Sequence, residues 1–146
     1  MPHPTLTCIK GKPTHMQVKI VLRELTANLM AVSCPWGHEK GHLGLLQDLA
    51  IYQACNGATF TILATKLPTY PIISVGASAP QCKELHATNA AICKVWTTYH
   101  LVLTITRDQF ARAIDNVSYA ELYNPIKGLN GIDLRMLVTH ILTTYA

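Results

Sequence analysis

Apolar residues recur at three- and four-residue steps along most of this chain, and the strict alternation typical of strands is nearly absent. The first such pattern predicts a helix over residues 15–31, whose apolar positions are Val18, Val21, Leu22, Leu25 and Leu29. Thr14-His-Met-Gln17 forms a capping box before it, because a Thr side chain can accept from an early helix amide while Gln reaches back. The helix is expected to stop before Pro35, since proline disfavours helical geometry in the preceding residue.

Four further helices are predicted downstream, over residues 43–56, 80–104, 106–124 and 133–145. Asn56-Gly57 is a suitable stop for the first of these. Ser78-Ala-Pro-Gln81 is a second capping box and begins the longest helix. Thr106-Arg-Asp-Gln109 is a third, so we expect the long helix to end near residue 104 and a separate helix to follow.

Helical periodicity is lost between the second and third main helices. Phe60-Thr-Ile-Leu63 is short and strand-like, and residues 64–80 form a long Pro-rich connection with Pro68, Pro71 and Gly76. A loop of this length is unusual inside a compact domain, so it is functional, pinned to the surface, or disordered. The whole pattern predicts an all-α fold, about five helices in one bundle-like domain.

The two ends of the chain are expected to differ. Residues 1–13 contain three prolines and predict a flexible basic arm, followed by a helical domain over 14–146. The last helix reaches the final residues without a cap, so we expect the domain to be truncated at its carboxyl terminus. No acidic residue precedes Glu24, which makes Lys10, Lys12 and Lys19 candidates for nucleic-acid contact, with a solvated tail as the alternative.

The composition is short of charge. Hydrophobic residues make up 49% of the chain and charged residues only 14%, against about 25% charged in a typical soluble domain. Three explanations remain open, namely burial by self-assembly, excision from a longer chain, or a copy no longer selected for solubility. Five cysteines, an apolar run too short for a membrane span and no signal-peptide pattern predict an intracellular, cytoplasmic protein without a membrane partner.

One loop carries metal-ligand residue types. "CPWGHEKGH" places Cys34, His38 and His42 at four-residue intervals. The spacing matches no standard zinc motif, the fourth ligand would have to come from elsewhere, such as Cys55, and the Pro and Gly residues disfavour one helical face. A Cys34–His38 dyad is a second hypothesis. We favour a turn with a half-buried Trp36 as its structural anchor, and we expect no metal and no cofactor.

Other chemistry has little support in the sequence. Four possible ligands fall near one face of the long predicted helix, namely Cys82, His86, Cys93 and His100. Packing at the margin of the core is a simpler interpretation of them than a metal or redox role. No G-x-S-x-G elbow, phosphate-binding loop or G-x-G-x-x-G turn occurs. We therefore predict no catalytic residue, no small-molecule substrate and no enzymatic activity.

Several strings resemble a known family. "VLRELTANLMAVSCPWGHEKGHLGLLQDLAIYQACNGATFTI" looks like the amino-terminal part of the Gag polyprotein of copia-type LTR retrotransposons. "ATNAAICKVWTTYHLV", "TRDQFARAIDNVSYAEL" and "GLNGIDLRMLVTHILTTYA" are similar to its later helices. The resemblance covers roughly residues 15–146 and rests on the order and spacing of structural motifs.

The resemblance implies a non-enzymatic, capsid-like protein that forms homo-oligomers around RNA. The C-x2-C-x4-H-x4-C knuckle and the Asp-Ser/Thr-Gly protease triplet found elsewhere in such polyproteins are absent from this sequence. A repurposed or degenerate Gag fragment that acts as a protein- or nucleic-acid-binding module is the alternative. A small thiol- or metal-dependent enzyme centred on Cys34 is the third.

Overall fold

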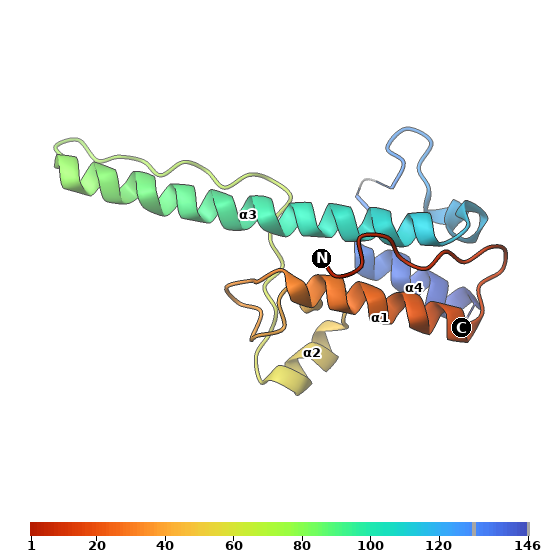
Figure 1. Cartoon of the computed structure of the whole chain (residues 1–146). Helices are drawn as coiled ribbons and strands as arrows, with labels where there is room; N and C mark the ends of the chain where they lie inside the picture. Colours follow the sequence, from red (N-terminus) through yellow and green to blue (C-terminus); the bar gives the residue numbers. More distant parts are fainter. Residues whose placement is uncertain (130, 146) are drawn as a thin grey trace.

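The computed structural model describes residues 1–129 and 131–145, and over these residues the chain is helical with no strand. The elements are α1 (His15–Ala31), η1 (Leu43–Leu45), α2 (Leu49–Asn56), α3 (Ala79–Ala113), η2 (Asn116–Leu122) and α4 (Leu134–Tyr145). Figure 1 shows α1, α4 and the second half of α3 side by side, while the first half of α3 projects away from them. The all-α prediction is confirmed. The expected truncation point at Ala146 lies outside the described residues.

Helix α1 forms as its sequence predicts. Thr14 and Gln17 make the reciprocal capping box, and the last helical residue is Ala31. The apolar side of α1 meets α3 and α4 in one core. Its fully buried members include Val18, Val21, Leu25 and Leu29 from α1, and Leu134, Leu137 and Ile141 from α4.

Helix α3 runs without interruption for 35 residues, so the predicted break before Thr106 is wrong. The Thr106 hydroxyl donates to the Val102 carbonyl oxygen at 2.6 Å, one turn back within the same helix, and does not cap a new one. The helix continues because its buried positions continue at helical spacing across the expected break, at Tyr99, Val102, Thr106, Phe110 and Ala113. The second half of the predicted fourth helix is the 3-10 helix η2.

The predicted helix over 43–56 is divided into η1 and α2. Asp48 begins α2 by accepting from the amides of Ala50 and Ile51, which places a cap inside the predicted helix. Gly57, in the left-handed conformation, ends α2 as expected. Residues 57–78 then contain no helix or strand, so the strand-like interpretation of Phe60–Leu63 is also wrong.

The amino-terminal segment, expected as a flexible arm, lies along α1 and the end of α3 (Figure 1). Leu6 and Ile9 are buried, and the Ile9 amide donates to the Ala113 carbonyl oxygen at 2.6 Å. The buried Asn28 side chain binds both the amide and the carbonyl of His3. Prolines keep this segment extended, and extended backbone can pack against helices when its apolar residues reach the core.

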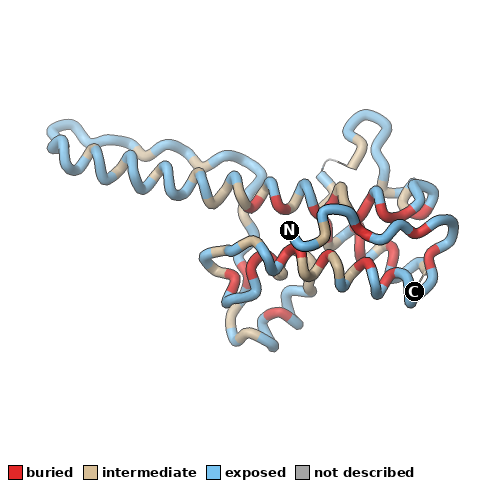
Figure 2. Tube along the Cα trace, in the orientation of Figure 1, coloured by how far each residue is buried: buried red, intermediate tan, exposed pale blue. Residues whose placement is uncertain are grey.

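A projecting hairpin leaves the helical body. It consists of a strap, residues 64–78, which leads outward, and the first half of α3, residues 79–98, which returns beside the strap (Figure 1). Figure 2 shows that most of this hairpin is exposed, while the buried positions gather where α3 joins α1 and α4. The long Pro-rich connection of the sequence is this strap.

Candidate functional site

The loop over residues 33–42 closes onto the carboxyl end of α1. The amide of His42 donates to the Leu29 carbonyl oxygen at 2.8 Å. The loop passes so close that a Cβ on Gly41 would lie 2.6 to 2.8 Å from the carbonyl oxygens of Leu29, Met30 and Val32. Gly41 also has a φ of +56°, so this position requires glycine for both its conformation and its space. The loop therefore covers carbonyl groups that α1 leaves without helical partners.

His42 is buried as part of this closure. Its Nδ1 lies 2.8 Å from the Val32 carbonyl oxygen, and because a carbonyl only accepts, Nδ1 carries the proton. Burial lowers the pKa of His42, and the hydrogen bond to Val32 opposes that effect to a lesser extent. The imidazole is thus held neutral by its surroundings.

His38 makes a different connection, to Tyr52 on α2. The Tyr52 hydroxyl donates to the Gly37 carbonyl oxygen at 3.0 Å, which leaves it to accept from His38 Nδ1 at 3.1 Å. Burial raises the pKa of Tyr52, so its hydroxyl keeps its proton. This pair of hydrogen bonds ties the loop to α2.

The two histidines of the loop are therefore directed to separate partners, and neither is hydrogen-bonded to Cys34. Burial raises the pKa of the Cys34 thiol, which disfavours the thiolate that metal binding and nucleophilic attack require. Cys55, the suggested fourth ligand, is exposed on α2. Across residues 1–129 and 131–145, no three His, Cys, Asp or Glu side chains are grouped closely enough to hold a metal ion.

Trp36 is half-buried within an aromatic cluster that joins the loop to the core. Its ring centroid lies 6.2 Å from that of Phe60 and 6.3 Å from that of Tyr99. Phe60 in turn contacts Tyr52 edge-on at 5.5 Å, a favourable arrangement of aromatic rings. The sequence pointed to Trp36, but Phe60 and Tyr99 gave no separate signal because each lies within a different predicted element.

Two features of η1 place it beside this cluster. A Cβ on Gly44 would lie 2.1 Å from the Phe60 ring, so the glycine of η1 is needed for the close approach of Phe60. Arg135, at the start of α4, donates to the carbonyl oxygens of Gly44 and Gln47 and so fixes η1 against the bundle. These contacts join residues far apart in the chain, and no sequence motif marks them.

The strap is attached to α3 at few points. The indole Nε1 of Trp96 donates to the Ala64 carbonyl oxygen at 3.0 Å, and the same oxygen lies 2.8 Å from His100 Nε2. Further along, the rings of Tyr70 and His86 lie 5.6 Å apart. His86 and His100, which the sequence predicted to pack at the margin of the core, thus contact the strap. Cys82 and Cys93 are half-buried on the same helix.

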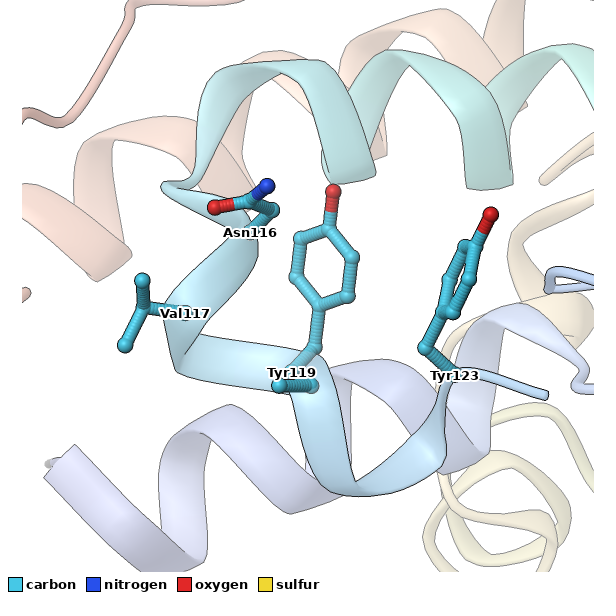
Figure 3. A pocket seen from close by; sticks show the side chains of 5 residues that line it. Asn116, Val117, Tyr119 and Tyr123 are labelled. Atoms are coloured by element: carbon cyan, nitrogen blue, oxygen red, sulfur yellow. The ribbon is translucent and has the colours of Figure 1, made fainter. Parts of the chain in front are cut away.

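Among the hollows at the surface of the described residues are two with mainly apolar linings. An apolar groove of about 310 Å³ lies between the loop, the strap and α3, lined by Trp36, Leu63, Pro68, Ile92 and Trp96 among others. A second hollow, of about 430 Å³, is formed by η2. Figure 3 shows Tyr119 and Tyr123 there with their rings directed toward the end of α3. Neither lining includes a carboxylate, a thiol or an imidazole.

The candidate nucleic-acid contacts Lys10, Lys12 and Lys19 are all exposed. The first two lie in the segment that leads into α1, and Lys19 lies on α1 itself. Within the described part of the chain, the only ion pair is Arg107–Asp108, so the three ammonium groups have no acidic partner.

No protein family, no curated protein and no solved structure matches this chain. Among the helices of the described residues, none combines the length and the apolar character that crossing a membrane would require.

Proposed function

We propose that this chain is a non-enzymatic, Gag-like structural protein that self-associates through helical surfaces in a capsid-like assembly. The observation that carries the proposal is an excess of surface. The chain exposes 9179 Å², whereas a folded monomer of 16.1 kDa typically exposes about 7,400 Å². The excess of about 1,800 Å² is larger than the roughly 800 Å² that each partner buries in a standard interface.

The projecting hairpin exposes large apolar side chains. Ile72 and Val75 of the strap are almost fully exposed, and Ile92 of α3 is half exposed. Residues 64–98 include only four charged side chains, namely Lys66, Lys83, Glu84 and Lys94. Large apolar side chains with little charge around them are typical of a surface that another protein covers.

The geometry of the loop supports a structural role over a catalytic one. His42 is neutral and engaged with α1, His38 is engaged with Tyr52, and the Cys34 thiol has a raised pKa. A nucleophile needs an activating base within hydrogen-bond reach. Each imidazole here is hydrogen-bonded to a tyrosine or a carbonyl group and not to the thiol.

The test is the mass of the purified protein in solution as a function of concentration. Sedimentation velocity should show species heavier than the 16.1 kDa chain that increase with concentration, and electron microscopy at high concentration should show particles. A strictly monomeric protein over the whole range would refute the proposal.

A second candidate is a nucleic-acid-binding module, favoured by Lys10, Lys12 and Lys19, which are exposed and make no ion pair with any described residue. Three phosphate contacts would give a log–log salt slope of about −2 for single-stranded RNA. Binding of a labelled RNA should therefore weaken with salt and fall when all three lysines are replaced by Gln. The matched control is Lys40→Gln with Lys66→Gln and Lys127→Gln, which removes the same charge from other exposed sites.

A further inference from the structure

The side of α3 opposite Trp96 and His100 carries a stripe of exposed residues. Trp96 and His100 bind the strap from one side of the helix. On the other side, exposed residues follow one another at steps of three, four or seven positions, which places them on one helical stripe. Along one edge of this stripe, Ala91 and Lys94 border a hollow beside Pro35, and Glu84 borders a hollow at the tip of the strap. The members of the stripe are Glu84, Ala87, Ala91, Lys94, Leu101 and Ile105.

We propose that this stripe is the interface with a second copy of the chain, packed antiparallel to the first about a two-fold axis. The inference rests on the proposed function and names the partner and the register. A two-fold interface brings residue i of one copy against residue j of the other, and j against i. With the axis near residue 89, Glu84 of each copy faces Lys94 of the other, and Ala87 faces Ala91.

This register brings opposite charges together and also places apolar side chains of one copy against those of the other. Glu84 and Lys94 form two identical ion pairs across the axis, whereas a parallel arrangement would place like charges together. The tip of the hairpin, where Val75 is fully exposed, then reaches the base of α3 on the other copy. Leu101, 56% exposed, and Ile105 lie on that base, about 18 Å and about 24 Å along the helix from the axis at about 1.5 Å per residue.

The shape of the exposed stripe favours a second copy over a small ligand. The stripe runs from Glu84 to Ile105, about 31 Å along the helix at about 1.5 Å per residue, a length that suits packing against another helix. The alanines at the centre of the stripe allow two helix backbones to approach closely. The net charge of the hairpin, three lysines against one glutamate, is low enough for pairing with itself.

Charge reversal at the two proposed partners tests the register. Glu84→Lys should weaken dimerisation about tenfold or more, because it sets two like-charge pairs in place of two ion pairs. Lys94→Glu should do the same. The double variant Glu84→Lys with Lys94→Glu restores opposite charges and should associate within a few fold of the unchanged chain. Glu121→Lys, an exposed site on η2 with the same change in net charge, should associate normally.

Mixing the two single variants is the decisive measurement. Each should be mainly monomeric alone, and an equimolar mixture should recover the dimer, because both contacts across the axis of a mixed dimer again join opposite charges. Far-UV circular dichroism checks that each variant keeps its helices. If the unchanged chain associates and the single variants associate equally well, the register is overturned while the proposed self-association stands. If the unchanged chain is monomeric, both are overturned.

Discussion

The buried imidazole of His42 donates from Nδ1 to the carbonyl oxygen of Val32 across 2.8 Å, while the amide of the same residue binds Leu29. One residue of the loop thus meets two carbonyl groups at the end of α1. The residue types that suggest a metal ligand serve here to close a helix. This arrangement depends on the adjacent Gly41, on the neutral state of the imidazole, and on the aromatic cluster that holds the loop from the other side.

Gly41→Ala should destabilise the protein strongly. The added Cβ would meet three carbonyl oxygens at 2.6 to 2.8 Å, in addition to the cost of the left-handed conformation. We expect a loss of about 3 kcal/mol or more in the free energy of unfolding, measured by urea denaturation. Gly57→Ala is the control, since Gly57 has a φ of +74° but open space around it. That variant should lose only about 1 to 2 kcal/mol, and equal losses at both sites would contradict the crowding at Gly41.

The stability of the protein should fall as the pH falls through the titration range of His42. Burial lowers the pKa of His42 below its model-compound value of 6.5, so the unfolded chain binds this proton more readily than the folded one. The contribution of the neutral His42 to the free energy of unfolding is therefore fully present above about pH 7. It is lost progressively as the pH drops toward the pKa of His42 in the folded state. Urea denaturation over this range measures the effect.

A matched variant separates His42 from the other titrating groups. His42→Asn keeps a neutral donor near Val32 but removes the titration, so the slope of stability against pH just below neutrality should become shallower. Glu24 acts in a separate window, because its hydrogen bonds to Thr7 lower its carboxyl pKa below 4.5 and its contribution is lost only in more acidic solution. An unchanged slope in His42→Asn would show that His42 does not titrate as described.

Replacing Thr by Val at two sites should distinguish a helix start from a helix interior. Thr14 caps α1, and Thr14→Val should cost about 1 kcal/mol because an early amide loses its acceptor. Thr106→Val should be close to neutral, since its hydroxyl binds a carbonyl inside α3 that the helix itself already satisfies. Denaturation curves of both variants test this, and a cap-sized loss at Thr106 would support two helices in place of one.

Phe60→Ala should cost about 3 to 5 kcal/mol, the usual range for removing a buried aromatic ring. Phe60 is 3% exposed and its ring lies against those of Trp36, Tyr52 and Tyr99. Ile62→Ala, two residues further and 51% exposed, is the control and should change stability by less than about 0.5 kcal/mol. Trp fluorescence during denaturation reports both, and similar losses would mean that residues 60–62 do not pack as described.

The limits of the sequence are clear at particular residues. The ends of α1 were predictable because a capping box and a following proline act within a few residues of the helix they bound. The continuity of α3 through Thr106 was not predictable, because a capping-box pattern also occurs inside a helix when the buried stripe continues past it. The loop could be identified as a candidate, but its hydrogen bonds to Val32, Leu29 and Tyr52 depend on how α1 and α2 are placed.

The sequence by itself determined the helical class, the limits of α1 and α4, and the Pro-rich connection, since periodicity, caps and proline act locally. The tertiary structure alone decided that α3 is one helix, that residues 1–13 pack against the body, and that Phe60 joins Trp36 and Tyr99. It also decided which face of α3 is left uncovered. The physical reason is the same in each case. These features depend on which apolar surfaces pack together between residues far apart in the chain, and a local sequence pattern does not specify that packing.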